Sequence, residues 1–459
     1  MAYITNKALV VLENELVIAN RVTREYSNEF AQTGAKIGNV VSIRRPPRYK
    51  GTYGPPLNVE DTNETFCQVA LNYQFHVDVQ FTTQDLAVAM DLFAERVLKP
   101  QIAPVANRVD SDTAQYAYLN TAAQVGTPGT SPNSLKLFTD ARAILAAEAC
   151  PREGEKNAVL DPISMSSMVA TVQGLFNPQA RIGEFIEAGM IAREFAGIDW
   201  WEDQNIPVQL TGPGGNSAVN TVTVTATPTG TALLSTGWAQ QGTLSTGGWQ
   251  ASTAVVTVGD IIQIYGAAGA TATAVYPVNP QNRLQYGKTP RQFVVLPPGG
   301  FVTPPNGAAN PGLTFGAATL TNGTFNPATG QYTSTAGGLL TLTIGDAIIS
   351  GGQFQNVTSA PVASGSIALN GNLLVAGNAN ITTPQSLVFH KYAFALAFAD
   401  LPLPRGVEYA ARAYDDEDIG MSIRCVTQYT INNDSEPTRA DVLYGPASLY
   451  RSLALRVAG

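Results

Sequence analysis

One segment of this sequence is almost free of charge, and it restricts what the chain can fold into more than any other feature. Between residues 205 and 385 only five side chains carry a charge: Asp260, Arg283, Lys288, Arg291 and Asp346. The same segment holds 27 of the 42 glycines, and stretches such as 221–227 alternate threonine with apolar residues. Alternation with a period of two, broken often by glycine, predicts short β-strands. Because uncharged strands leave adhesive edges unless a sheet closes, we predict a sandwich or small barrel here.

The flanks of this charge-poor segment carry mixed helix and strand signals. An amphipathic pattern begins near Thr83 and resumes beyond Pro100 and Pro104, which predicts one long kinked helix or two nearly collinear helices over 84–120. We expect further helices over 134–150 and from residue 165 to 172, with a short strand at 158–160 between them. At 459 residues the chain is long enough for two or three domains, or for one domain with a large insert. The expected class is therefore α+β.

Residues 36–81 have the pattern of an extended hairpin. Strand-like residues 40–43 and a long alternating run over 66–81 flank a tip rich in proline and glycine. Four basic residues lie close together near the tip: Arg44, Arg45, Arg48 and Lys50. Such a hairpin cannot bury both faces against its own domain. Docking onto another subunit is therefore the favoured function, and a simple solvated loop is the alternative.

An acidic run lies near the other end of the chain. It consists of Asp415, Asp416, Glu417 and Asp418. Contiguous acids alternate sides on an extended chain and lack the spacing of a calcium loop, so a bound cation is disfavoured. A solvated face, or a contact surface for the basic hairpin, fits the charge pattern better.

The sequence offers little material for a metal site or another cofactor. Neither His76 nor His390 has a second histidine or a cysteine at metal-ligand spacing. Three cysteines lie far apart, which indicates buried thiols: Cys67, Cys150 and Cys425. No stretch is long and apolar enough for a membrane span, and the N-terminus is expected to form a cytoplasmic, amphipathic helix. A net charge of −8 argues against a general polyanion binder.

Catalytic motifs are equally scarce. The Gly-Lys-Thr triplet at 287–289 has Asn282 where a phosphate loop requires glycine. Asp260 and Asp346 each follow a glycine before an apolar run, so they could form a carboxylate pair in an enzyme. Two turns that launch strands are the favoured interpretation. We therefore expect that the protein is not an enzyme.

Five short motifs, none of them catalytic, accompany this order of segments: 106–109 (ANRV), 196–207 (AGIDWWEDQNIP), 275–281 (VYPVNPQ), 292–295 (QFVV) and 441–445 (DVLYG). Together, the order and the motifs resemble the major capsid protein of tailed bacteriophages, which has the Hong Kong 97-type (Johnson) fold. More closely, the chain is similar to the coat-protein family of short-tailed lambdoid Salmonella phages, whose platform is interrupted by an insertion domain. The likeness covers nearly the whole chain.

The resemblance implies a division of the chain into six parts. These would be an N-terminal arm (1–34), an E-loop reaching over a neighbour (35–82), the peripheral domain's spine helix (83–125), the first part of the axial domain (126–205), a β-barrel insertion domain (206–385) and the closing axial and peripheral strands (386–459). Within that scheme Arg44, Arg45, Arg48 and Lys50 are candidate intersubunit contacts, and the acidic run 415–418 is their candidate counterpart.

The resemblance also implies partners and a location. Hundreds of copies would form hexamers and pentamers of an icosahedral shell around a scaffolding protein, in the cytoplasm of a bacterial host. A portal protein would admit double-stranded DNA, which the shell meets only by non-specific proximity, and a decoration protein is a further candidate partner. The finished protein would reside in the virion and contact no membrane. A weakly charged, acidic lining suits such a container, because it does not hold DNA tightly.

One departure from the family concerns a loop of the insertion domain. Family members can carry charges there that pair across two-fold axes, whereas residues 233–250 carry none. Trp238 and Trp249 could replace the ionic contacts between subunits, or they could pack against their own barrel. Both alternatives stay open at the level of sequence.

A surface adhesin or a tailspike-like protein is the main rival hypothesis. It would explain the threonine- and glycine-rich segment and the low charge. It also predicts a repeated solenoid pattern and a signal or anchor, and the sequence shows neither. The capsid interpretation is therefore favoured.

Overall fold

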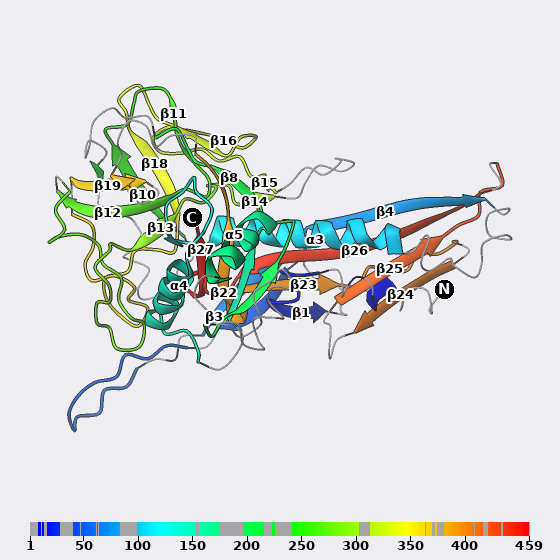
Figure 1. Ribbon diagram of the computed structural model, residues 1–459, viewed down its shortest axis with the longest axis horizontal. Helices are drawn as coiled ribbons and strands as arrows, with labels where there is room; N and C mark the ends of the chain where they lie inside the picture. Colours follow the sequence, from blue (N-terminus) through cyan, green and yellow to red (C-terminus); the bar gives the residue numbers. More distant parts are fainter. Residues whose placement is uncertain are drawn as a thin grey trace.

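The computed structural model gives an elongated molecule with a long blade at one end and a rounded, strand-rich body at the other (Figure 1). It describes residues 8–10, 12, 16–27, 40–45, 47–60, 62, 64–82, 99–152, 156–173, 196–214, 223–224, 241–267, 269–302, 313–362, 364–369, 372–373, 381–407, 409–415, 421–432 and 435–458. Helices and strands are both present, so the α+β class is confirmed. No helix in the described part of the chain has the length and apolar character needed to span a membrane.

A long sheet forms the blade. Its strands follow the order β1-β23-β26-β25-β24, and β4 also pairs with β26. The strands are β1 (Thr23–Ser27), β4 (Tyr73–Thr82), β23 (Phe394–Ala399), β24 (Tyr409–Asp415), β25 (Met421–Thr427) and β26 (Ser435–Ser448). Helix α3 (Lys99–Asn120) packs along β26 and β4. Ile102, Val105 and Val109 are fully buried, which gives the helix the apolar face that its sequence pattern predicted.

A second sheet joins the blade to the rounded body. Its order is β5-β27-β22-β6-β7, and the helices α4 and α5 follow β5 and β6 along the chain. The bounds are β5 (Ala123–Val125), α4 (Leu135–Ala147), β6 (Lys156–Leu160), α5 (Pro162–Gln173), β7 (Asp199–Glu202), β22 (Ser386–His390) and β27 (Ala454–Val457). The Ser134 hydroxyl caps α4 by accepting the Lys136 N–H at 3.2 Å. Both predicted helices and the strand between them are thus confirmed.

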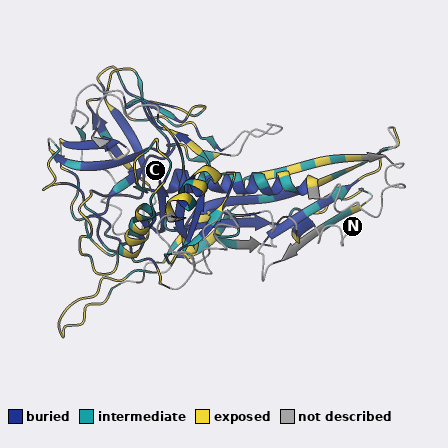
Figure 2. Ribbon diagram, viewed as in Figure 1, coloured by how far each residue is buried: buried dark blue, intermediate teal, exposed yellow. Residues whose placement is uncertain are grey.

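The described part of the charge-poor segment consists of strands and the loops between them. The main sheet has the order β13-β12-β19-β9-β10-β18, and a bridge between Val295 and Ile344 links its two ends. Its strands, with β20 beside β19, are β9 (Thr223–Val224), β10 (Gln241–Gly247), β12 (Ile261–Ala267), β13 (Gln292–Val294), β18 (Leu340–Gly345), β19 (Gly365–Leu369) and β20 (Asn372–Leu373). Figure 2 shows several of these strands in the dark blue of buried residues. The short strands predicted for this segment are confirmed among its described residues, whereas of the alternating stretch 221–227 only 223–224 lie in the described part.

Shorter pairs complete this segment. A three-stranded sheet and a small hairpin lie beside the main sheet, formed by β11 (Ala254–Thr257), β16 (Thr324–Asn326) and β17 (Gln331–Thr333), and by β14 (Phe301–Val302) with β15 (Thr314–Phe315). The chain enters and leaves the segment through a pair formed by β8 (Val208–Leu210) and β21 (Thr382–Pro384).

Two expectations about strands are wrong. The run 66–81 is not one strand, because the chain turns at Leu71 and Asn72, where the Asn72 N–H binds the Ala70 carbonyl at 3.1 Å. Its first part is β3 (Thr65–Ala70), which pairs with β2 (Val40–Arg45), and its second part is β4 in the blade. Asp346 does not launch a strand, since it follows β18 at a φ of 63°. The apolar residues after it are buried without joining a strand.

The structure describes only parts of the expected spine helix and of the expected N-terminal arm. The part of the spine over 84–98 lies outside the described residues, and α3 continues from Lys99 through Pro104. The N-terminal residues described include a strand, β1, which runs parallel to β23. Leu12, Ile18 and Val22 are fully buried, so this part of the expected arm lies in the chain's own core.

Candidate intersubunit surfaces

The root of the hairpin arm (residues 40–70) is fixed to the blade. Strands β2 and β3 pair from Val40 opposite Ala70 to Arg45 opposite Thr65. One apolar cluster joins the arm to β23 and β26, with members Cys67, Val69, Leu71, Ala395, Ala397, Ala399, Ala447 and Leu449. The Arg45 guanidinium and the Cys67 thiol both donate to the Ser448 carbonyl, at 3.1 and 3.4 Å. The root is therefore part of the subunit's core.

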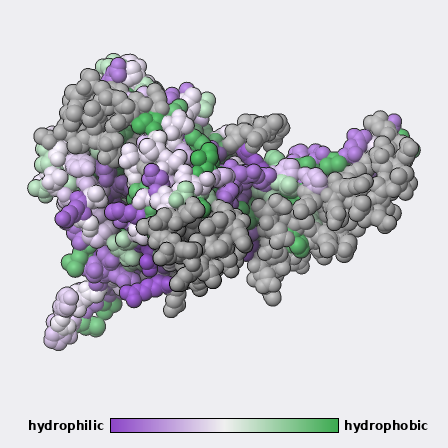
Figure 3. All heavy atoms as spheres, in the orientation of Figure 1, coloured by the Kyte–Doolittle hydropathy of each residue, from purple (hydrophilic) through white to green (hydrophobic). Residues whose placement is uncertain are grey.

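The tip of the arm projects away from this anchored root (Figure 1). Its bend is organised by the Glu60 carboxylate, which accepts the N–H groups of Lys50 and Gly51 at 2.6 and 2.8 Å. Large apolar side chains there are open to solvent: Tyr53 is 107%, Leu57 90% and Val59 77% exposed. Figure 3 shows the projection with green apolar atoms among paler ones. Contiguous exposed apolar side chains mark interaction surfaces, so the tip is the first candidate surface.

The four basic residues predicted as contacts divide into two pairs. Arg44 and Lys50 point outward, and the Arg44 guanidinium lies 3.8 Å from the Glu64 carboxylate with both side chains at least half exposed. An exposed ion pair of this kind contributes little stability. Arg45 is buried and Arg48 half-buried, and their guanidinium carbons lie 5.9 and 5.8 Å from the Tyr450 ring centre. Partial or full burial lowers the pKa of Arg45 and of Arg48.

Of the predicted site residues near the C-terminus, only Asp415 lies among the described residues. It is the last residue of β24, while Asp416, Glu417 and Asp418 lie outside the described part of the chain. Figure 1 places β24 in the blade, far from the tip of the hairpin arm. One copy of the chain does not bring Asp415 to the basic tip, so a contact between them would require two copies.

The structure places Trp249 inside its own strand-rich body. The side chain is 4% exposed, and its indole N–H donates to the Thr246 hydroxyl at 2.8 Å. Its backbone N–H binds the Gly338 carbonyl at 3.1 Å. Of the two alternatives for this residue, packing against its own barrel agrees with these contacts. Trp238 lies outside the described residues.

A polar joint that the sequence analysis missed connects the charge-poor segment to the rest of the chain. Three of its five charged residues bind partners outside the segment: Arg291 pairs with Glu148 at 3.0 Å, Asp346 with Arg451 at 3.2 Å, and Arg283 donates to the Tyr49 carbonyl at 3.5 Å. The first two pairs are buried. The small number of charges in the segment was the signal in the sequence, because a charged side chain that is buried in an apolar body requires a partner.

Arg456 contributes the most deeply buried cation of this joint. It lies on β27 at 1% exposure, and its guanidinium donates to Gln209 Oε1 at 2.8 Å, to the Gly259 carbonyl at 2.7 Å and to the Thr121 carbonyl at 3.0 Å. Burial lowers the pKa of Arg456 to about 10, so the group stays charged at neutral pH. The Arg456 side chain thus connects three parts of the chain: the end of α3, the charge-poor segment near β8 and β12, and the sheet that contains β27.

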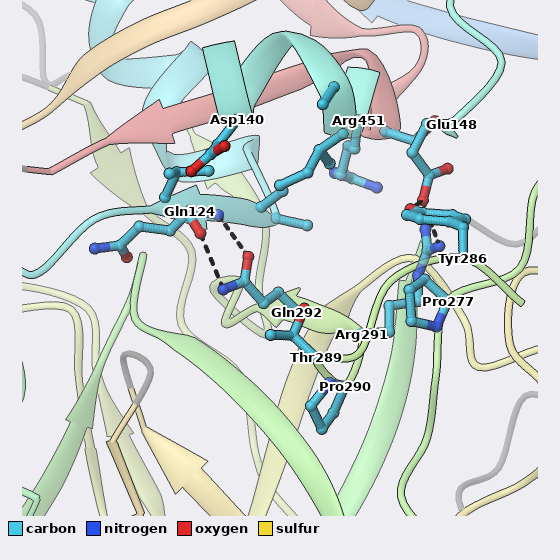
Figure 4. A pocket seen from close by; sticks show the side chains of 16 residues that line it. Gln124, Asp140, Glu148, Pro277, Tyr286, Thr289, Pro290, Arg291, Gln292 and Arg451 are labelled. Carbon is cyan, nitrogen blue, oxygen red and sulfur yellow. Dashed lines mark hydrogen bonds and ion pairs between the residues drawn. The ribbon is translucent and has the colours of Figure 1, made fainter. Parts of the chain in front are cut away.

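A cavity of about 440 Å³ lies within this joint, between α4, β5 and the loop 277–292. Figure 4 shows Glu148 approached by Tyr286 and Arg291 on one side. On the other side the Gln292 side-chain amide accepts the Gln124 backbone N–H and donates to the Gln124 carbonyl. Burial and the Glu148 carboxylate raise the pKa of Tyr286. Several polar groups of the lining bind one another. The described residues contain no cluster of histidine, cysteine or acidic residues that could hold a metal.

Comparison with known proteins gives one family match. The family model described as P22 coat protein, gene protein 5, matches residues 1–268. Solved structures that resemble the chain at low identity include Mycobacterium phage Che8 (10% identity, 96% of this chain, 90% of that chain, TM-score 0.39) and the capsid of the Cyanophage P-SCSP1u (10%, 96%, 88%, 0.39). A virus-like particle from Pyrococcus furiosus is similar over 99% of this chain and 98% of its own (6%, TM-score 0.35). No curated protein matches.

Proposed function

The chain belongs to the P22 coat protein family, and we propose that many copies of it assemble, with a scaffolding protein, into an icosahedral shell that encloses a phage genome. Membership makes it a phage capsid protein, which is a structural protein and not an enzyme. The polar groups of the joint are consistent with that role, because several of them bind one another.

The observation that carries the assembly proposal is the contrast between the root and the tip of the hairpin arm. The root is buried in the chain's own core, whereas Tyr53, Leu57 and Val59 are exposed at the tip. Leaving such apolar area in water is unfavourable by about 25 cal/mol per Å². A neighbouring copy that covers the tip removes this penalty, and closed symmetry then repeats the same contact around the shell.

The proposed division of the chain follows the Hong Kong 97-type fold. Residues 1–34 would be the N-terminal arm, 35–82 the E-loop, 83–125 the spine and 206–385 the insertion domain, with 126–205 and 386–459 forming the axial and peripheral parts. The pairing of β8 with β21 supports the view of an insertion, because the chain leaves and returns through adjacent strands. Because the root is buried in the subunit, the part of the proposed E-loop that can contact a neighbour is the tip beyond Arg45.

The proposed contacts between copies use the outward groups. Arg44 and Lys50 are the exposed cations of the arm, and the acidic run that begins at Asp415 is the proposed counterpart on a neighbour. Hexamers, pentamers, a portal and a decoration protein belong to the same proposal, as do assembly in the bacterial cytoplasm and residence in the virion. The packaged DNA would lie near the shell without specific contacts.

Particle mass and shape test the proposal directly. The protein is expressed with and without a scaffold candidate and studied by sedimentation velocity and negative-stain electron microscopy. Closed shells, or the large aberrant assemblies of an unscaffolded coat, are expected. A discrete monomer or trimer under every condition would overturn the proposal and favour a surface adhesin.

A further inference from the structure

A buried carboxylate on the spine helix holds the N-terminal segment (residues 16–22). Asp110 lies in the middle of α3 at 0% exposure, and its two oxygens accept the backbone N–H groups of Val17 and Ala19, both at 2.8 Å. The two N–H groups would otherwise be left without an acceptor in the core, which is costly, so the Asp110 side chain holds the segment at two points. This side chain is therefore the polar attachment of the segment to α3.

A second carboxyl group lies against the first. Asp203, just beyond β7, is 4% exposed, and its carboxyl group lies close enough to that of Asp110 for its charge to raise the pKa of Asp110. Its Oδ1 accepts the Asn205 N–H at 2.8 Å, while its buried Oδ2 receives no N–H or O–H donor from the residues described. A buried oxygen without a donor is costly. A proton held between the two carboxyl groups supplies the missing donor.

The two residues that follow Asp203 hold its loop against α3. The side chains of Gln204 and Asn205 both donate to Asn107 Oδ1, at 3.3 and 3.4 Å, one turn of α3 before Asp110. The loop that carries Asp203 is thus docked on the spine by its neighbours. Two carboxyl groups held in contact inside a protein cannot both ionise at ordinary cost.

Nearby cations are engaged elsewhere. On α3, Arg108 pairs with Asp112 at 2.9 Å, and the Asp112 carboxylate also accepts the Tyr444 hydroxyl of β26. On the N-terminal segment the Arg21 guanidinium lies 3.7 Å from the Trp201 ring centre, and Arg24 donates to Asn20. The other charged residues of β7, Asp199 and Glu202, are acids and cannot neutralise the pair.

We infer that Asp110 and Asp203 share one proton, and that this proton closes a latch between the N-terminal segment, the spine helix and the loop after β7. Loss of the proton leaves two buried carboxylates in contact, and their repulsion opens the latch. This inference concerns a single subunit and stands apart from the proposed function.

The direction of the pH response follows from the environment. Burial, and then the Asp203 charge, raise the pKa of Asp110 to about 8, and burial also raises the pKa of Asp203. A folded pKa above the unfolded value means that the folded state binds the extra proton. The latch therefore contributes its full stabilisation of the folded state below the unfolded pKa of an aspartate, and this stabilisation is lost as the pH rises through about 8.

Hydrogen exchange of the full chain tests the latch. Amide protection of residues 16–22, corrected for intrinsic exchange, is expected to fall about tenfold between about pH 7 and about pH 9. Asp203→Asn replaces the proton with a permanent amide donor, so its protection should stay constant over that range. Asp110→Asn weakens the acceptor and should lower protection at every pH. As a matched control, Asp140→Asn changes an exposed carboxylate of α4 and should behave like the parent.

Infrared spectroscopy detects the proton itself. The parent at neutral pH should show the C=O band of a protonated carboxyl group that Asp203→Asn reduces and Asp140→Asn leaves unchanged. Identical spectra of the parent and Asp203→Asn would overturn the inference, as would protection of residues 16–22 that does not change with pH. The spectra decide the matter even where Asp110→Asn fails to fold.

Discussion

At the scale of single residues, the charges that matter most are those in apolar surroundings. In the charge-poor segment the sequence pattern predicted turns at Asp260 and Asp346 and assigned no role to the two arginines. The structure shows that Asp346, Arg283 and Arg291 bind the rest of the chain. Sequence could identify them as exceptional but could not give their partners, because Glu148 and Arg451 lie more than 100 residues away. Contacts of this separation are created by the fold.

Removal of Arg456 should destabilise the subunit. Arg456→Met leaves the Gln209 Oε1 atom and the carbonyls of Gly259 and Thr121 without their donor. Leaving buried acceptors unpaired should lower the free energy of unfolding by about 3 kcal/mol. Urea unfolding measures the change, and the exposed Arg405→Met serves as the matched control with no expected effect. Equal midpoints for the two variants would contradict the role given to Arg456.

Trp249→Phe tests whether this side chain packs within its own barrel or forms a contact between subunits. The change removes the hydrogen bond to Thr246 and some buried volume, so the subunit should lose about 1 to 2 kcal/mol of stability. Sedimentation of the folded variant should still show normal assembly. Unchanged stability together with lost assembly would instead place Trp249 between subunits.

At the scale of elements, regular periodicity was predictable and the place where a strand changes partner was not. The alternation over 66–81 continues across Leu71 and Asn72 without a break in the pattern. Only the fold shows that the chain passes close to β26 at this turn, where a Cβ added at Gly445 would collide with the Ala70 carbonyl oxygen. The helices over 135–147 and 162–173 were predictable because their caps and apolar spacing are local.

Gly445→Ala should therefore damage the crossing of the hairpin arm over β26. The added methyl group meets backbone atoms, which cannot move as a flexible side chain can, so the strain should cost about 2 kcal/mol or more. Urea unfolding and hydrogen exchange of residues 65–70 would measure the loss. As a control, Gly351→Ala meets no atom within 4 Å and should leave both readouts unchanged.

Charge reversals in the basic cluster of the arm can compare its exposed residues with its buried residue Arg45. Arg44→Glu with Lys50→Glu changes exposed side chains, so the double variant should unfold at the parent's urea concentration and assemble poorly. Arg45→Glu buries a carboxylate in the apolar root and should lower subunit stability by about 3 kcal/mol. Normal shells from the double variant would remove Arg44 and Lys50 from the proposed contact. A double reversal at the exposed Lys288 and Arg405 controls for net charge.

At the scale of the whole molecule, the buried joint and the exposed tip have opposite roles. The order of elements and the strand content of the charge-poor segment were readable from the sequence, because composition and periodicity carry them. The joint and the burial of N-terminal apolar residues were not, since they depend on which surfaces meet; the buried residues are Ala8, Leu9, Leu12, Leu16, Ile18, Ala19 and Val22. A subunit whose inner contacts are satisfied can tolerate changes at its tip, so the tip is where assembly and stability should separate.

The triple variant Tyr53→Ser, Leu57→Ser and Val59→Ser tests that separation. These side chains are exposed, so stability of the isolated subunit should stay within about 0.5 kcal/mol of the parent. Assembly should fail, because a neighbour gains little by covering a polar tip. Sedimentation velocity with scaffold should show subunits in place of shells, whereas Leu284→Ser, an apolar-to-polar change at a side chain 66% exposed, should assemble normally. Shells formed by the triple variant would mean that copies associate through surfaces other than this tip.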